Sequence, residues 1–455
     1  MLLSSWSDRL TLLPYTLSAM NILFVHTALP GVQFNSSIAA LSSWLKAHGH
    51  SVQLLTIQDD ATPQEISQAA GASGAEVVGL SFMTCRLARV RDVLPHLRAA
   101  LPHARFIAGG AHPTTYPAQT LQELAVDAIC AGEGEVGLLG WLEQPDAAHP
   151  GIIRRDSADP VQRPRFTDVD GLPDWDRALF GDVTNAGNRY EQAVGVAMSR
   201  GFCPFTCTFC GIDGYRRLHE QPTAGAMQLR SVERAVQEMA AAMDVVPVPQ
   251  GFATWDAIFP LDRRWVSKFC EAYARDIGQP LAVQLRVEQV TDALVSDLAQ
   301  AGCDYAVLGL ECGDEAYRKR FLDKPFTNAA ALSAVQRLED AGITVHASFI
   351  MGLPFETPQH LAATVRMAQE IGAGELSWKY YTPERWTRLY SLCVANDLIV
   401  PKYVDHPFGA GEAMIVMTHC TQADLDKAHE ALRIIRGPEP TESSPTPRPP
   451  VELRA

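Results

Sequence analysis

The sequence predicts an α/β protein with two parallel-sheet domains and a small helical cap. Apolar runs of strand length alternate with segments of helical apolar spacing from residue 21 to 108, and again from 193 to 381. Five prolines between residues 145 and 173 interrupt any long periodic element between these two series. A chain of 455 residues is long enough for two or three domains. We therefore expect a doubly wound sheet first and six strand–helix units second.

The first domain is expected over residues 20–145. Its strands are predicted at 21–26, 51–57, 77–81 and 105–108, and its helices at 37–48, 63–70 and 89–100. Ligands of doubly wound sheets bind outside the carboxyl ends of the strands, which directs attention to loops 27–31, 81–84 and 109–114. Residues 1–19 begin like a weak signal peptide, but Asp8 and Arg9 interrupt the apolar run. We interpret them as a disordered leader or as a start assigned too early.

A linker over residues 146–192 leads to the second domain, which is expected over residues 193–385. Its six strands are predicted at 193–199, 251–256, 281–287, 305–310, 344–350 and 375–381, with helices at 231–243, 261–277, 291–301, 328–341 and 359–371. Two helices, 386–396 and 421–435, are expected to form a cap over residues 386–436. The proline-rich segment 437–455 has few apolar residues, so we expect a disordered tail.

Composition limits the function classes. The formal net charge of −14 argues against a nucleic-acid partner. No run of 18 apolar residues occurs, so no membrane span is predicted. Seven of the ten cysteines show no paired spacing, which is typical of buried thiols in a reducing cytoplasm.

The other three cysteines lie close together in the segment 199–210. Cys203, Cys207 and Cys210 form a C-x3-C-x2-C pattern. Three thiolates on one loop suit an iron–sulfur cluster or zinc, but a closed zinc site takes four ligands and no Cys or His follows before His219. Three ligands on a four-iron cluster leave one iron open for another molecule.

This loop resembles the cluster motif of the radical S-adenosylmethionine enzymes, including Phe209 before the third cysteine and Gly211 after it. The resemblance implies a 4Fe-4S cluster on the three cysteines. It also implies S-adenosylmethionine bound to the open iron and cleaved reductively, with a reductant such as flavodoxin or ferredoxin. The six strand–helix units then correspond to the partial (βα)6 barrel of that family, in which function gathers at the carboxyl ends of the strands.

Those strand ends supply the expected S-adenosylmethionine contacts. By resemblance, Asp256 faces the methionine ammonium, Gly309 and Glu311 belong to the segment that meets the ribose hydroxyls, and Gly352 and Pro354 to the turn that passes the adenine. Arg286 and Glu288 are expected to flank the sulfonium or its carboxylate. Trp378, Tyr380 and Tyr381 either line the substrate pocket or close an open barrel edge.

The first domain resembles the Rossmann-like, flavodoxin-like cobalamin-binding domain that precedes many of these barrels. The resemblance rests on Gly109-Gly-Ala-His-Pro-Thr114 and on Gly132-Glu-Gly-Glu135. A flavodoxin-like domain without a ligand is the alternative. The residues expected around cobalamin are Thr27, Ala28, Leu29, Gly31, Ser81, Met83, Thr84, Gly109, Gly110, His112, Pro113, Gly132, Glu133 and Gly134.

The chain lacks the D-x-H-x-x-G pattern that supplies a cobalt-ligating histidine in cobalamin mutases. We therefore expect cobalamin without a protein histidine on cobalt, with His26 and His112 as polar or plain loop residues. The tRNA methylthiotransferases need three further N-terminal cysteines, whereas this region has only Cys85 and Cys130.

The resemblance implies a cytoplasmic cobalamin-dependent radical enzyme acting on a small molecule. Methyl transfer to an unactivated carbon or to phosphorus is the expected reaction. The alternatives are a radical cyclase or rearrangement enzyme with the same cofactors, and a non-catalytic cobalamin or cluster sensor. No residue stands out as a catalytic acid or base.

Overall fold

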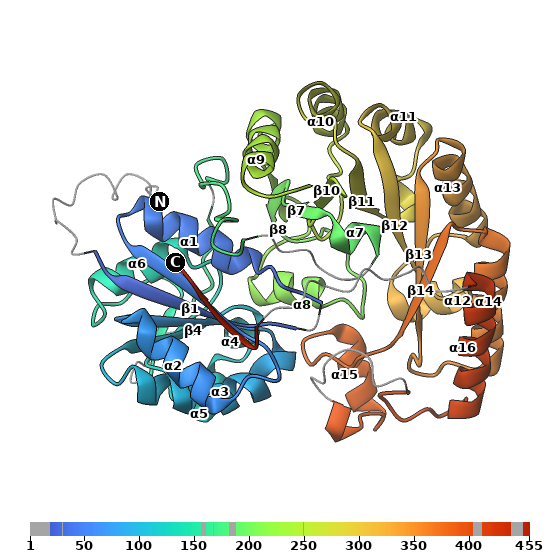
Figure 1. Ribbon diagram of the computed structural model, residues 1–455. Coiled ribbons are helices and arrows are strands. Elements are labelled where there is room, and N and C mark those ends of the chain that lie inside the picture. Colours follow the sequence, from blue (N-terminus) through green and yellow to red (C-terminus); the bar gives the residue numbers. More distant parts are fainter. Residues whose placement is uncertain are drawn as a thin grey trace, which may run out of the picture.

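The computed structural model describes residues 19–29, 31–155, 161–166, 168–181, 188–248, 250–403, 412–437 and 449–455. Two parallel sheets dominate the fold, one in the N-terminal domain and one in the barrel (Figure 1). The leader 1–18 lies outside the described residues, as do parts of the linker and of the predicted tail.

The N-terminal sheet has the strand order β15-β2-β1-β3-β4-β5-β6. Its parallel strands are β1 (Asn21–Thr27), β2 (Ser51–Ile57), β3 (Val77–Ser81), β4 (Arg105–Gly109) and β5 (Ala128–Cys130), and β6 (Ile152–Arg154) is antiparallel to β5. The strand order reverses between β1 and β3. In doubly wound sheets, such a switch point is where a ligand binds.

Helices cover both faces of this sheet (Figure 1). Helices α1 (Ser36–Ala47) and α6 (Glu135–Glu143) pack on one face, and α2 (Pro63–Ser73) and α3 (Leu87–Ala100) pack on the other. The short elements η2 (Thr84–Arg86), α4 (Ala111–Thr115) and α5 (Pro117–Glu123) complete the domain. The predicted doubly wound sheet is confirmed. The sequence did not reveal β5 and β6, because three residues are too few to show a period.

The prediction of a disordered tail is wrong for its last residues. Strand β15 (Val451–Arg454) pairs antiparallel with the edge strand β2, and its red ribbon crosses the blue domain in Figure 1. Val451 and Leu453 pack against the core beneath α2 and α3, and Gln58 N donates to Pro450 O at 2.8 Å. The edge strand β2 offers unpaired backbone groups, and β15 pairs with them. The composition of the tail does not predict this pairing. Residues 438–448 lie outside the described part.

The barrel is a six-stranded sheet with the order β14-β13-β12-β11-β10-β7. All neighbouring strands in it are parallel. The strands are β7 (Val194–Val196), β10 (Phe252–Thr254), β11 (Leu281–Leu285), β12 (Cys303–Glu311), β13 (Thr344–Met351) and β14 (Glu375–Tyr380). The six predicted strands are therefore all present, and the partial barrel is confirmed.

The helices α9 (Val232–Val245), α10 (Arg263–Asp276), α11 (Asp292–Gln300), α13 (Asn328–Asp340) and α14 (Pro358–Ile371) follow the barrel strands in turn. The chain also forms α7 (Arg189–Gln192), α8 (Gly211–Leu218), η3 (Val287–Gln289), α12 (Glu315–Tyr317), the π-helical turn η4 (Arg318–Leu322), α15 (Arg388–Ala395), η5 (Pro401–Tyr403) and α16 (Gln422–Arg436). Strands β8 (Ser199–Gly201) and β9 (Met227–Leu229) pair as an antiparallel ribbon after β7. No helix in the described ranges is long and apolar enough to cross a bilayer.

Candidate active site between two domains

The three predicted cluster cysteines lie on one loop between β8 and α8. Cys203, Cys207 and Cys210 are all partly exposed. Two hydroxyls fix the loop from outside, because Thr206 Oγ1 donates to Asp323 at 2.8 Å and Thr208 Oγ1 donates to the carbonyl of Phe321. The loop is therefore braced by η4, an element more than 100 residues later in the chain.

The chemistry of these thiols fits an iron–sulfur cluster. Burial raises the pKa of Cys203, and it raises the pKa of Cys210 to about 12. Such thiols stay protonated at neutral pH unless a metal replaces the proton. In an iron–sulfur cluster each thiolate binds its own iron. Among the described residues, no three His, Cys, Asp or Glu side chains are grouped to hold one metal ion.

Arg286, at the end of β11, contacts this loop directly. Its Nη1 donates to Cys207 Sγ at 2.9 Å, and its guanidinium lies 4.0 Å from the centre of the Phe205 ring. Its Nη2 also forms an ion pair with Glu288 at 2.7 Å. Burial alone would raise the pKa of Glu288, but Arg286 outweighs that effect and lowers it. A cation and a carboxylate therefore stand together beside the cysteines.

Glu311, at the end of β12, is held by a lysine that the sequence analysis missed. Lys324 Nζ lies 2.8 Å from Glu311 Oε1 and 2.6 Å from the carbonyl of Gly309. Glu311 has a φ of 64°, and the register between β12 and β13 shifts at this point. A Cβ on Gly309 would lie 2.4 Å from Glu311 Oε1, so a larger residue there would displace this carboxylate from its ion pair with Lys324. No local pattern around Lys324 would have revealed this partner.

The turn at Gly352–Pro354 is held by a buried acid. Glu356 Oε2 accepts hydrogen bonds from the backbone N–H groups of Gly352 at 2.8 Å and Leu353 at 3.2 Å. Burial raises the pKa of Glu356 to about 8. Glu356 was not among the residues predicted for this site.

Asp256 braces the start of the cysteine loop. Its carboxylate accepts from Met198 N at 2.8 Å and from the hydroxyl of Ser199. Burial raises its pKa to about 6. The contact with a methionine ammonium stays a prediction, whereas the contact with the loop is observed.

Phe209 and Gly211 lie where the loop enters α8. Phe209 packs against the apolar cluster formed by the barrel mouth and the cap. A Cβ on Gly211 would lie 2.9 Å from Trp386 Nε1, and one on Gly214 would lie 2.2 Å from Cδ1 of the same tryptophan. These two glycines allow Trp386 to lie directly on the first turn of α8.

The three aromatic residues expected at the substrate pocket pack elsewhere. Trp378 Nε1 donates to His429 of α16 at 3.0 Å, and Tyr380, on the same face of β14, joins the core between sheet and helices. Tyr381 is buried with Leu389 and Cys393 of the cap. These contacts favour the alternative interpretation, in which the aromatic residues close the barrel edge.

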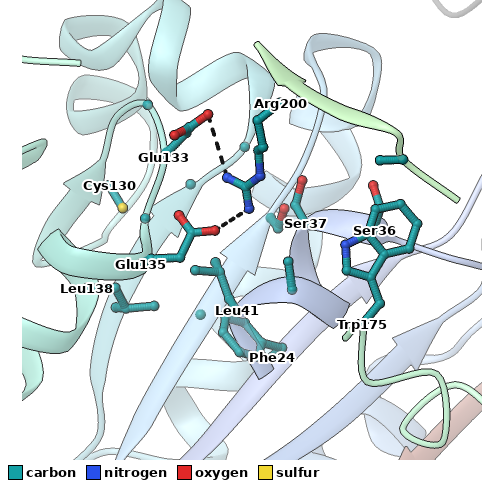
Figure 2. A pocket seen from close by; sticks show the side chains of 18 of the residues that line it. Phe24, Ser36, Ser37, Leu41, Cys130, Glu133, Glu135, Leu138, Trp175 and Arg200 are labelled. Carbon is teal, nitrogen blue, oxygen red and sulfur yellow. Dashed lines mark hydrogen bonds and ion pairs between the residues drawn. The ribbon is translucent and has the colours of Figure 1, made fainter. Parts of the chain in front are cut away.

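A cavity of about 370 Å³ lies at the switch point of the N-terminal sheet, between the two domains (Figure 2). Its walls come from β1, β3, β4, α1 and the turn 132–135 on one side, and from the linker and barrel on the other. Lining residues include Phe24, Ser36, Ser37, Leu41, Gly79, Leu80, Ile107, Cys130, Leu138, Trp175, Arg200 and Trp255. A second cavity of about 350 Å³ shares Ser36, Ser37, Ser81 and Gly110 with the first.

Glycines keep the first cavity open. A Cβ on Gly79 would lie 2.7 Å from the Phe24 ring, and one on Gly110, where φ is +90°, would lie 2.8 Å from Phe82 N. Larger side chains at these positions would collide with the chain or enter the cavity. The apolar walls and the glycine turns fit the nucleotide tail of cobalamin at the predicted edge of the sheet.

Most of the residues predicted around cobalamin line these two cavities. Ser81, Gly109, Gly110, Gly132, Glu133 and Gly134 line the first, and Thr27, Leu29, Ser81, Met83 and Gly110 line the second. Of the described residues predicted there, Ala28, Gly31, Thr84, His112 and Pro113 line neither. The wall from α1 was not predicted, because helix residues carry no glycine signal, and Trp175 was not among the predicted lining residues.

The two candidate histidines differ in their surroundings. His112 is fully buried, stacks on Phe82 and lies 3.3 Å from Thr84 Oγ1, and burial lowers its pKa to about 4. It is a neutral packing residue. His26 lines the second cavity, with Nδ1 3.5 Å from Asn35 Nδ2.

An ion-pair network crosses the domain boundary at the first cavity. Arg200, on β8, lies 3.6 Å from Glu133 and forms a closer ion pair with Glu135. Figure 2 shows the guanidinium between the two carboxylates. Burial would lower the pKa of Arg200, but the two carboxylates outweigh burial and raise it.

Comparison with known proteins agrees with this arrangement. The family described as "B12 binding domain" matches residues 23–140, and the family described as "Radical SAM superfamily" matches residues 200–368. The anaerobic magnesium-protoporphyrin IX monomethyl ester cyclase of Rubrivivax gelatinosus is 24% identical over 402 residues, covering 82% of this chain and 69% of the relative. An uncharacterized methyltransferase of Pyrococcus horikoshii is 23% identical over 386 residues, covering 80% of this chain and 79% of the relative.

One solved structure has the same fold with cofactors bound. It is the radical S-adenosylmethionine methyltransferase TsrM from Kitasatospora setae with cobalamin and a [4Fe-4S] cluster, with a TM-score of 0.65 and 15% identity. The alignment covers 83% of this chain and 79% of that one. The chain described above therefore carries a B12-binding domain followed by a domain of the radical SAM superfamily.

Proposed function

We propose that this protein is a cobalamin-dependent radical S-adenosylmethionine methyltransferase that acts on an unactivated carbon or phosphorus of a small molecule. The observation that carries the proposal is the cavity between the domains. Its walls combine the switch point of the B12-binding domain with Ser199, Arg200 and Gly201, which lead directly into the cysteine loop. A cofactor held there would lie beside the radical-generating site.

The residues of the chain provide the binding groups. When bound, the cluster and S-adenosylmethionine supply one-electron cleavage of a sulfonium, and cobalamin supplies methyl transfer. Cys203, Cys207 and Cys210 hold the cluster, and Arg286 places a positive charge at Cys207. The N-terminal sheet orients the corrin through its glycine turns, without a histidine on cobalt.

A zwitterionic nucleotide needs a cation near its carboxylate, oxygens near its diol and a flat surface for its base. Arg286 and Glu288 offer a positive and a negative charge beside the cysteine loop. Lys324 holds Oε1 of Glu311, so Oε2 of the same carboxylate is offered to the ribose hydroxyls. The turn Gly352–Pro354, fixed by Glu356, passes the adenine. Asp256 acts through Ser199, which it fixes at the start of the loop.

One of the two named relatives supports methyl transfer, because the alignment with the uncharacterized methyltransferase of Pyrococcus horikoshii covers 80% of this chain. The experiment requires no known substrate. Protein reconstituted anaerobically with iron, sulfide and hydroxocobalamin is reduced with titanium(III) citrate and supplied with S-adenosylmethionine. We expect S-adenosylhomocysteine with a methylcobalamin absorbance spectrum, and 5′-deoxyadenosine as the second product.

The control is the triple variant with C203A, C207A and C210A. It should yield no 5′-deoxyadenosine, because reductive cleavage of S-adenosylmethionine needs the cluster. Wild-type protein that forms 5′-deoxyadenosine without S-adenosylhomocysteine would contradict methyl transfer and leave radical chemistry intact.

A second candidate is a radical cyclase with the same cofactors. It is favoured by the relative from Rubrivivax gelatinosus, which is named a cyclase and spans 82% of this chain. A cyclase would give a product without an added methyl mass and no S-adenosylhomocysteine during turnover.

A further inference from the structure

The cofactor cavity and the cysteine loop are joined by one buried side chain. Arg200 belongs to β8 and stands three residues before Cys203 in the chain. Its guanidinium reaches across the domain boundary to Glu133 and Glu135, in the turn that lines the cavity (Figure 2). The side chain of Glu135 is only 3% exposed, and that of Arg200 is 20% exposed.

The linker ties the same two elements from the other side. The backbone N–H of Phe166 donates to Glu133, so one carboxylate is shared between the linker and Arg200. Arg165 Nη2 donates to the carbonyl of Arg200 at 3.4 Å and to Gln228 Oε1, on the partner strand β9, at 2.9 Å. The turn, the linker and the β8–β9 ribbon are therefore joined by one set of hydrogen bonds and ion pairs.

The backbone of the ribbon is equally constrained. Gly201 has a φ of +107°, and a Cβ there would lie 2.1 Å from Arg165 Nη2 and 2.2 Å from the carbonyl of Ala226. The segment between Arg200 and Cys203 thus has little freedom to adjust independently. The backbone that carries Arg200 is therefore fixed on the same short segment as Cys203.

Removing one partner from such a buried set leaves a charge without compensation. The set holds one guanidinium and two carboxylates, and both carboxylates form ion pairs with Arg200. If the turn 132–135 moves when the cavity is filled, Arg200 must follow it. If the cluster orders the cysteine loop, the loop holds Arg200 in the position where it pairs with the turn 132–135.

We propose that Arg200 is a positioning residue that couples occupancy of the B12 cavity to the geometry of the cluster loop. The inference rests on the proposed function, because it requires both cofactors in one chain. Coupling of this kind is reciprocal. If the bound cluster raises the affinity for cobalamin by some factor, bound cobalamin raises the affinity for the cluster by the same factor.

The test measures the dissociation constant of hydroxocobalamin, by absorbance and by quenching of Trp175 and Trp255, in the cluster-free and the cluster-reconstituted full-length protein. Wild type should bind about tenfold more tightly with the cluster present, within the range of ordinary coupling energies. In R200M the ratio should fall to about one, and in E135Q, which keeps its shape but loses its charge, it should fall partway. The control R189M removes a comparable ion pair with Asp304, at the far end of the barrel, and should keep the wild-type ratio.

A second measurement does not depend on binding strength. The electron paramagnetic resonance g values of the reduced cluster, recorded with enough reductant that added cobalamin is present as diamagnetic cob(I)alamin, should change on addition of cobalamin to wild type and to R189M, but not on addition to R200M. If R200M does not fold, E135Q decides the question by the same two measurements.

The proposal is overturned if R200M and E135Q keep the wild-type ratio and the wild-type spectral change. It is also overturned if wild type binds both cofactors with a ratio of one. Wild type that binds no hydroxocobalamin in either state would instead contradict the proposed function.

Discussion

Arg286 donates a hydrogen bond from Nη1 to the Sγ of Cys207 at 2.9 Å, so a buried guanidinium lies against one expected cluster ligand. A charge-assisted hydrogen bond to a cluster sulfur stabilises the reduced, more negative state. R286M should therefore shift the cluster midpoint potential to more negative values. A hydrogen bond to a charged group contributes about 1.5–3 kcal/mol, which for a one-electron couple corresponds to a shift of roughly 65–130 mV.

The measurement is a potentiometric titration followed by electron paramagnetic resonance, with cleavage followed in parallel. R189M is the matched control, because it removes a partly buried arginine from the opposite end of the barrel. An unchanged potential in R286M would show that the contact with Cys207 does not act on the cluster.

The sequence was sufficient to predict both sheets, because each strand is an apolar run between turn residues. It was also sufficient to predict the cysteine loop, whose three expected ligands all lie between residues 203 and 210. It did not reveal contacts between distant segments. Lys324 meets Glu311 only because η4 folds back under the end of β12, and Arg200 meets Glu135 only when the two domains dock.

The face of a strand was harder to predict than its existence. Trp378 and Tyr380 had two open interpretations, the substrate pocket or the barrel edge, and their positions on β14 place them against α16. Side chains alternate along a strand, so an error of one residue in register exchanges the interior for the exterior. Strand β15 was missed for another reason: its partner, the edge of β2, lies almost 400 residues earlier in the chain.

Glu356 gives a prediction for the dependence of stability on pH. Burial raises its pKa to about 8 in the folded protein, well above that of an unfolded glutamate. Between the two pKa values the folded state holds a proton that the unfolded state has lost, so stability falls as pH rises through this window. The side chain of E356Q cannot ionise. Between about pH 5 and pH 8, the range between the two pKa values, its melting temperature should therefore fall less than that of wild type. Parallel melting curves for the two proteins across that range would contradict the shift.

Gly110 gives a prediction for the cavity. G110A meets two penalties, a backbone at φ 90° and ψ −166° that is essentially restricted to glycine and costs other residues roughly 1–3 kcal/mol, and a Cβ placed 2.8 Å from Phe82 N. G437A is the control, because Gly437 has a similar backbone, with φ 75° and ψ −161°, but a Cβ added there would have nothing within 4 Å. G110A should lower the melting temperature more than G437A and should weaken hydroxocobalamin binding, which G437A leaves unchanged. Equal effects in the two variants would show that backbone conformation alone explains the glycine.

Strand β15 gives the last prediction, which concerns the edge of the N-terminal sheet. Removing residues 449–455 should expose the backbone of β2 and uncover the apolar surface that Val451 and Leu453 protect. Each partly buried apolar side chain contributes on the order of 1 kcal/mol, and the unpaired edge becomes a template for association with other chains. The truncated protein should therefore melt at a lower temperature and form larger species in size-exclusion chromatography. L453E separates the two effects, because it keeps the strand but removes the packing, and should lower the melting temperature with less association. A truncated protein that stays monomeric and melts like wild type would mean that β15 does not protect the edge in solution.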